Sequence, residues 1–184
     1  IIWIAVYIRK LPMQVISQTG KPGLWDVTRD TWTLGPDLDP FLFLRWAKEI
    51  IEHGSLPVLD VLRYIPVYMN TSLELKLVPY TIVWTYKFLN IFGTYSIDYA
   101  AVVMPVFMFA LTVVAFFLLV RKIFIDSVGE MKSNVIALIS SLFLSVIPAL
   151  LPRTIAGIPE KESIAFFYLF LAFYFFLCSW KAKT

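Results

Sequence analysis

The chain has 184 residues, of which 59% are hydrophobic and only 16% are charged. Soluble domains carry about a quarter of charged residues, so the composition excludes an ordinary soluble domain and predicts an all-α polytopic membrane protein. The formal net charge of +3 comes from Lys and Arg residues scattered along the chain, and no nucleic-acid partner is expected. The single cysteine, Cys178, excludes an intrachain disulfide.

Both ends of the chain resemble interrupted membrane segments. Residues 1–8 form an apolar run that is too short to cross a hydrocarbon core of about 30 Å, which takes about 20 helical residues. We interpret this run as the outer end of a truncated first transmembrane helix and not as a signal peptide. Residues 180–184 also stop just past an apolar segment. We therefore expect the chain to be a fragment of a larger polytopic protein.

Residues 9–96 are predicted to form a long outer loop that carries two interfacial helices. Over residues 40–53, apolar side chains recur on one helical face and charged side chains on another, which predicts an amphipathic helix near the membrane surface. Residues 75–92 are also apolar, but Lys76, Pro79 and Lys87 interrupt them. The uninterrupted part is too short for a span, so we expect a second interfacial helix there.

Three spans are predicted after this loop, at residues 97–120, 135–151 and 164–179. Lys and Arg residues cluster between the first two of these spans and follow the last one, and the positive-inside rule places both groups in the cytoplasm. Residues 152–163 then form a second outer loop. The long segment 9–96 lies on the same outer side, because long loops escape that rule.

Two aspartates, Asp37 and Asp39, stand one residue apart directly before Pro40. Proline is favoured at the first position of a helix, so the sequence predicts a helix that begins at Pro40. Asp39 would be its N-cap, with a carboxylate that accepts free backbone N–H groups. Alternatively, the pair presents oxygens to a hard divalent cation. The local sequence favours the cap.

A second acidic pair, Glu160 and Glu162, ends the second outer loop just before a span. Acidic residues in a first turn favour the helix dipole. In the alternative interpretation, acid pairs from two loops on one face supply the oxygens that Mg²⁺ or Mn²⁺ needs, and Arg153 holds a phosphate. Lys161 could contact the same phosphate or extend toward the lipid headgroups, and the second interpretation is favoured.

Both acidic motifs resemble one known family. The first resemblance runs through Asp39-Pro40-Phe41-Leu42-Phe43-Leu44-Arg45, the helix end at 49–54 and Asp60-x-x-Arg63-Tyr64-x-Pro66. The second is Arg153-Thr154-Ile155-Ala156-Gly157-x-x-Glu160-x-Glu162. These segments are similar to the first and second outer loops of the catalytic subunit of oligosaccharyltransferase, of the archaeal and eukaryotic type. The resemblance covers most of residues 35–180.

The resemblance implies a C-type glycosyltransferase fold with many membrane spans. Members of this family transfer an oligosaccharide from a lipid-linked phosphate or pyrophosphate carrier, such as dolichol, to the Asn of Asn-x-Ser/Thr acceptor polypeptides. The protein would lie among membrane lipids in the cell membrane of a prokaryote such as an archaeon, or in the endoplasmic reticulum of a eukaryote. Its active site would be on the outer or lumenal face.

The resemblance also implies roles for individual residues. Asp39 would be the catalytic acid that contacts a divalent metal, Mn²⁺ or Mg²⁺, and the acceptor amide. Glu160 and Glu162 would be the other metal ligands. Residue chemistry, and not the resemblance, makes Arg153 and Lys161 the candidates that bind the phosphate of the lipid donor.

The chain departs from the family pattern at several points. Glu160 stands where the family has Asp, and Pro159 replaces a more usual aromatic residue. Asp37 has no firm counterpart and is expected to be a neighbour of the site at most. A later loop with the second catalytic acid and a Trp-Trp-Asp acceptor-reading motif would lie beyond residue 184, so the fragment alone is expected to be inactive.

Two other functions are compatible with parts of the sequence. A protein O-mannosyltransferase also uses first-loop acids near a lipid phosphate, and its acceptor-reading region would differ. A transporter or a non-enzymatic membrane scaffold would also contain capped and interfacial helices. Transporter sites, however, lie near the bilayer midplane, and the predicted spans carry almost no ionisable residue in their interiors.

Overall fold

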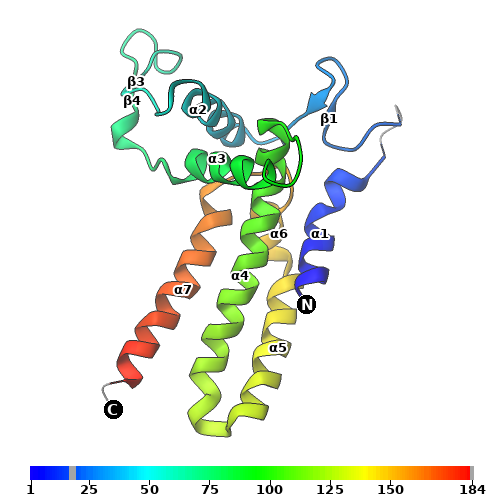
Figure 1. Ribbon diagram of the computed structural model, residues 1–184, viewed down its shortest axis with the longest axis vertical. Helices are drawn as coiled ribbons and strands as arrows, with labels where there is room; N and C mark the ends of the chain where they lie inside the picture. The colour runs from blue at the N-terminus through cyan, green and yellow to red at the C-terminus, as the bar shows by residue number, and fades with distance from the viewer. Residues whose placement is uncertain (17–19, 183–184) are drawn as a thin grey trace.

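The computed structural model describes residues 1–16 and 20–182 of the chain (Figure 1). Long helices run side by side below a cap of shorter elements, and α2 and α3 lie across their upper ends (Figure 1). The longer helices are α1 (Ile2–Gln14), α2 (Asp39–His53), α3 (Leu77–Leu89), α4 (Ile97–Val128), α5 (Glu130–Val146) and α7 (Lys161–Lys181). The short elements are β1 (Trp25–Asp26), β2 (Thr31–Trp32), β3 (Leu59–Asp60), β4 (Met69–Asn70), η1 (Thr71–Leu73), η2 (Pro148–Leu150) and α6 (Leu151–Thr154).

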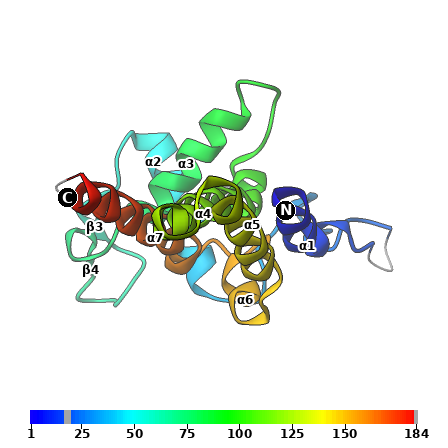
Figure 2. The same ribbon diagram turned by 90° about the horizontal axis from the view of Figure 1, so that it is seen from below.

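Helix α4 is the central element of the bundle. It packs against α7 on one side and against α5 and α1 on the other, and α3 covers its outer end. Seen from below, α7, α4, α5 and α1 follow one another in a row with α4 near the middle (Figure 2). The two small antiparallel hairpins, β1–β2 and β3–β4, belong to the cap and not to the bundle (Figure 1).

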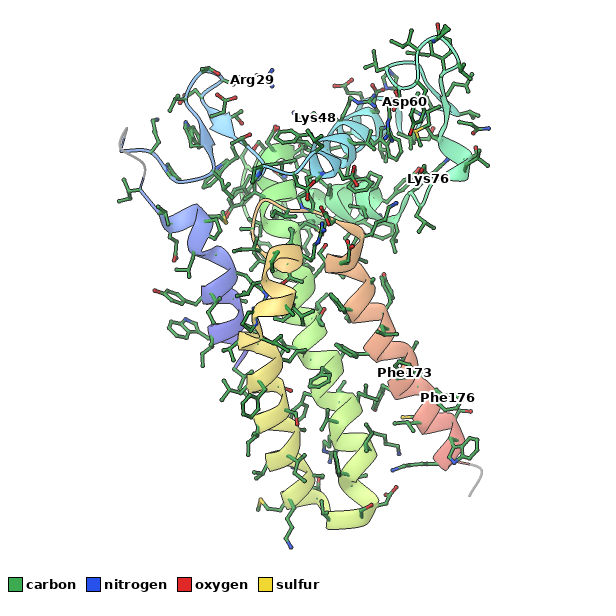
Figure 3. The ribbon with its side chains drawn as sticks, turned by 180° about the vertical axis from the view of Figure 1, so that it is seen from behind. Arg29, Lys48, Asp60, Lys76, Phe173 and Phe176 are labelled. Carbon is green, nitrogen blue, oxygen red and sulfur yellow. The ribbon has the colours of Figure 1, made fainter. Side chains whose placement is uncertain are left out.

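Two helices among the described residues, α4 with 32 residues and α7 with 21, are long and apolar enough to cross a membrane. A third span exists if α5 and the η2–α6 segment, which are bent by 55° at their junction, count as one. Exposed Phe173 and Phe176 project from the lower half of α7, whereas Arg29 and Lys48 lie in the cap (Figure 3). The chain is therefore an all-α integral membrane protein, as its composition predicts.

The helices follow the predicted segments but differ at their ends. The two helices expected at the interface are α2 and α3, within one to three residues of the predicted bounds. Helix α4 continues eight residues past the predicted limit of 120, because Gly129 with φ +80° is the first residue that ends it. The predicted span 135–151 is not continuous, since α5 ends at Val146 and Pro148 opens a new turn.

The prediction that Asp39 is an N-cap is wrong. Helix α2 begins at Asp39 itself, Leu38 precedes it, and no side chain caps this end. Asp37 lies two positions before the helix and does not cap it, since its Oδ1 accepts the N–H of Leu38, the residue that precedes the helix, at 2.8 Å. Pro40 is consequently the second helical residue, where its missing N–H still costs nothing.

The core lies where the cap meets the outer half of α4. Helix α2 buries Phe43, Trp46, Ala47 and Ile50, whose spacing of three and four residues forms one helical face. These side chains belong to one cluster with residues of α3 and α4. Each large apolar side chain buried in this way contributes about 1.5–3 kcal/mol. The packing fixes the first outer loop against the bundle.

Three backbone hydrogen bonds fix the second outer loop at the same place. Ala156 N–H donates to the Arg9 carbonyl of α1 at 3.0 Å, and Gly157 N–H donates to the Val102 carbonyl of α4 at 2.9 Å. In return, the Gly157 carbonyl accepts the N–H of Gly35 from the first outer loop at 2.8 Å. The irregular stretch between α6 and α7 is thus held by backbone groups from three other segments.

Gly157 provides a test of this close packing. Its φ is +85°, and a Cβ atom there would lie 2.7 Å from Leu24 Cδ1 and 3.2 Å from the Gly35 nitrogen. We predict that Gly157→Ala lowers the free energy of unfolding by about 1–3 kcal/mol, because strain and steric overlap add. The midpoint of thermal unfolding in detergent measures the effect. Gly54→Ala is the control, since Gly54 has φ +80° and no atom within 4 Å. A loss no larger than that of the control would contradict the close packing.

Candidate functional site at the outer end of the bundle

Three charged side chains meet where three elements end. Asp37 lies just before α2, Arg153 lies in α6, and Glu160 is the N-cap position of α7. Arg153 Nη1 forms a hydrogen-bonded ion pair with Glu160 Oε2 and lies 3.5 Å from Asp37 Oδ2. The arginine and the aspartate are separated by 116 positions in the sequence. The structure therefore joins the two predicted outer loops at one group of charges.

Glu160 is the buried member of this group. Only 5% of the residue is exposed, and the Ser163 hydroxyl donates to its backbone carbonyl at 2.6 Å. This hydrogen bond fixes the first turn of α7, whose free N–H groups favour a nearby negative charge. Arg153, in contrast, keeps 48% of its side chain exposed. The guanidinium therefore forms the accessible side of the pair.

Asp37 and Glu160 influence each other's protonation. The pKa of Glu160 is raised to about 7, chiefly by burial and next by a hydrogen bond with Asp37, while the ion pair with Arg153 acts in the opposite direction. The same hydrogen bond lowers the pKa of Asp37, assisted by the backbone N–H of Leu38. A protonated Glu160 thus donates to an ionised Asp37, and the two carboxyl groups titrate as a pair.

Asp39 lies beside this group and not in it. It is exposed at the first position of α2, and within the part of the chain that the structure describes its carboxylate makes no hydrogen bond or ion pair. Asp37, which the sequence placed only as a neighbour, is the residue that contacts Glu160 and Arg153. Asp39 therefore remains available to a ligand.

Glu162 and Lys161 lie on the first turn of α7. Glu162 is exposed and close enough to Arg153 to interact with it electrostatically. Lys161 Nζ lies 3.6 Å from Glu74 Oε2, an ion pair that neither interpretation of the sequence included. Beside these two residues lies an apolar cleft of about 570 Å³ between the start of α3 and α7, lined by Leu75, Val78, Lys161, Glu162, Ile164 and Phe166 among others.

The carboxylates do not converge as a set of metal ligands. Among the described residues, no group of three or more His, Cys, Asp or Glu side chains is placed to hold a metal ion. Glu160 is already paired with Arg153 and hydrogen-bonded to Asp37, while Asp39 is in no ion pair within the described residues. In this arrangement the guanidinium of Arg153 offsets the charge of the acids.

Two residues of the first motif have a structural role. Asp60 is 6% exposed, and Arg45 binds both of its carboxylate oxygens, one of them at 3.0 Å. Trp46 Nε1 donates to the same carboxylate at 2.9 Å. These contacts fix the β3–β4 hairpin to α2 in the cap, where Figure 3 labels Asp60. Bidentate pairing of this kind is the strongest geometry for an arginine and a carboxylate.

Some of these partners leave no pattern in the sequence. Glu74 is one acid among thirteen, and only the folded chain brings it to Lys161. Asp37 stands just before the predicted helix, but no local pattern connects it to Glu160 or Arg153. Its contact with Arg153 follows from the packing of the two outer loops.

The fold and the site together define the class of protein to which the chain belongs. The chain is an integral membrane protein with a group of acidic and basic side chains at one end of its helical bundle, next to an apolar cleft. The family model described as oligosaccharyl transferase STT3, N-terminal, matches residues 15–184. The chain belongs to this family, which identifies it as a glycosyltransferase of N-glycosylation. No curated protein matches the chain significantly.

The paired carboxyl groups predict a dependence of stability on pH. Glu160 has a usual pKa of 4.5 that rises to about 7 in the folded protein, so between these values the folded state binds more protons than the unfolded state. Stability should therefore be greatest near pH 5 and should decline as the pH rises through 7. Thermal unfolding midpoints at pH 5, 6, 7 and 8 measure the decline.

Glu160→Gln should flatten this dependence, because an amide donates to Asp37 at every pH. Asp30→Asn is the control, since Asp30 lies in the β1–β2 turn and its side chain is 79% exposed. A slope that survives in Glu160→Gln would assign the pH dependence to another group.

Proposed function

We propose that the protein transfers an oligosaccharide from a lipid-linked phosphate or pyrophosphate donor to the Asn side chain of Asn-x-Ser/Thr acceptors. The observation that carries the proposal is the family match over residues 15–184, which contains both acidic loops. The charged group at the end of the bundle and the apolar cleft beside it also support the proposal, because together they suit a substrate with a charged head and a lipid tail. We place this site on the outer or lumenal face, in a cell membrane or in the endoplasmic reticulum.

The reaction is difficult for two reasons: the acceptor amide nitrogen is a poor nucleophile, and the leaving phosphate gains negative charge. The acceptor amide nitrogen forms a bond to the anomeric carbon of the sugar, the bond from that carbon to the phosphate oxygen breaks, and the oxygen keeps the electron pair. The amide loses one proton to solvent or to a base. A carboxylate that accepts an amide N–H makes the nitrogen lone pair more available, and a cationic side chain stabilises the departing phosphate.

We assign these tasks to the exposed members of the site. Asp39 has an unoccupied carboxylate at the first position of α2 and would accept the N–H groups of the acceptor amide. Arg153, half exposed, would contact the phosphate of the donor. Asp37 and Glu160 both accept from Nη1 of this guanidinium and thus fix its direction. Lys161 is the second candidate for the phosphate, once it leaves Glu74.

Metal dependence rests on the family resemblance. We propose that Mn²⁺ or Mg²⁺ assists the transfer, with Asp39, Glu160 and Glu162 as the acids that would hold it. Among the described residues these three carboxylates do not meet at one point. When bound, such a cation would add positive charge where the phosphate departs.

Transfer to a labelled Asn-x-Thr peptide by the intact enzyme tests the proposal. We predict that Asp39→Asn lowers kcat on the order of 10²-fold, because a positioned hydrogen-bond partner of the transition state is lost. Asp30→Asn, the same change at an exposed turn, should leave transfer unchanged. Equal activity of Asp39→Asn and the control would contradict the role of Asp39.

Two further arms of the assay test the acceptor and the metal. A peptide with Gln in place of the acceptor Asn should receive no glycan, whereas modification at Ser or Thr would indicate an O-mannosyltransferase instead. Excess EDTA should abolish transfer, and Mn²⁺ or Mg²⁺ should restore it. Undiminished transfer in EDTA would contradict the metal dependence.

A further inference from the structure

Arg9 is a charged side chain in the interior of the bundle. It lies in α1 and is 0% exposed, and it precedes residues 15–184, which the family model matches. Within the described residues no carboxylate pairs with it. Its guanidinium carbon lies 3.2 Å from the centroid of the Phe109 ring on α4. A buried charge is costly unless other groups offset it, so its hydrogen-bond partners are informative.

The first partner is the broken end of α5. This helix ends at Val146, and Ile147 has extended dihedral angles, so the last carbonyl groups of α5 have no partner within the helix. Arg9 Nη1 donates to one of these carbonyl oxygens, that of Ser145, at 2.8 Å. The C-terminal end of a helix dipole also attracts a positive charge. The broken helix therefore offsets the charge of Arg9.

The second partner lies beyond the bend. Arg9 Nε donates to Thr154 Oγ1 at 2.9 Å, and the Thr154 hydroxyl donates to the Leu150 carbonyl at 2.6 Å. The guanidinium thus contacts α5 with one nitrogen and α6 with another, across the 55° bend between them. Thr154 directly follows Arg153, and the Arg9 carbonyl accepts the N–H of Ala156.

We propose that Arg9 is a positioning residue for the outer site, because it fixes the bend that aims Arg153 at Asp37 and Glu160. The Arg9 side chain ties the two halves of the bent segment together, and its backbone carbonyl ties the following loop to α1. The kinetic part of this inference rests on the proposed function. The structural part, that Arg9 holds the bend, can be tested without any transfer activity.

Hydrogen exchange of the intact enzyme in detergent tests the structural part. In Arg9→Met, peptides that cover residues 147–160 should exchange at least tenfold faster than in the wild type, because Ser145 and Thr154 lose their donor. Lys10→Met is the matched control, since it removes the same charge from the next position of α1, where the side chain is partly exposed. Unchanged exchange in Arg9→Met, or equal acceleration in the control, would overturn the proposal.

Steady-state kinetics of Arg9 variants distinguish a positioning role of Arg9 from a purely stabilising one. A misplaced reacting group costs turnover and not substrate affinity, so Arg9→Met should lower kcat about 10- to 100-fold while KM for the acceptor peptide stays nearly constant. Arg9→Lys should recover part of the loss, because an ammonium group can still reach the Ser145 carbonyl but cannot also bridge to Thr154. A loss confined to the fraction of folded enzyme, with normal kcat per folded molecule, would overturn the positioning role.

A second variant keeps the proposal testable if Arg9→Met does not fold. Thr154→Val removes the acceptor for Arg9 Nε, whereas Thr154→Ser keeps it. Faster exchange of residues 147–160 and a lower kcat in the valine variant alone would support the proposal, and equal behaviour of the two variants would overturn it. If the wild type transfers no glycan at all, the proposed function fails, and the exchange data still decide whether Arg9 holds the bend.

Discussion

The hydrogen bonds of Ala156 and Gly157 are the constraint on which the outer half of the molecule depends. Their N–H groups reach the carbonyl oxygens of Arg9 and Val102, and the Gly157 carbonyl receives the N–H of Gly35. Each bond contributes only about 1 kcal/mol, but together they bring α1, α4 and both outer loops to one point. The close approach is possible because neither Gly35 nor Gly157 has a Cβ atom.

This constraint explains why the charged group is arranged as it is. Once the two loops are joined, Asp37 from the first and Glu160 from the second both contact Nη1 of Arg153. Two carboxyl groups so close cannot both ionise easily, and the guanidinium and a shared proton relieve the repulsion. Asp39 and part of Arg153 stay exposed, and the apolar cleft between α3 and α7 begins at the neighbouring Lys161 and Glu162.

Hydropathy and helical periodicity predicted most of the fold, because they depend on local composition. The face of Phe43, Trp46 and Ile50 and the apolar run of α4 are visible in the sequence and became α2 and the central helix. The contact of Arg153 with Asp37 and the burial of Arg9 leave no local pattern, since the partners are more than 100 positions apart. Helix α2 begins one residue earlier than the sequence predicts, because proline tolerates both the first and the second position of a helix.

The two loops meet at Gly35 and Ile158, and an engineered disulfide between these positions tests this contact most directly. A Cβ atom at Gly35 would lie 3.1 Å from Ile158 Cγ1, so Gly35→Cys and Ile158→Cys, in a Cys178→Ser background, should cross-link under mild oxidation in membranes. Mass spectrometry of unreduced peptides should detect the linked pair. Cysteines at Gly54 and Ile158 should not cross-link, because Gly54 lies at the far end of α2, about 22 Å along the helix. If the first pair fails to link while both cysteines react with maleimide, the two loops do not meet at Gly35 and Ile158.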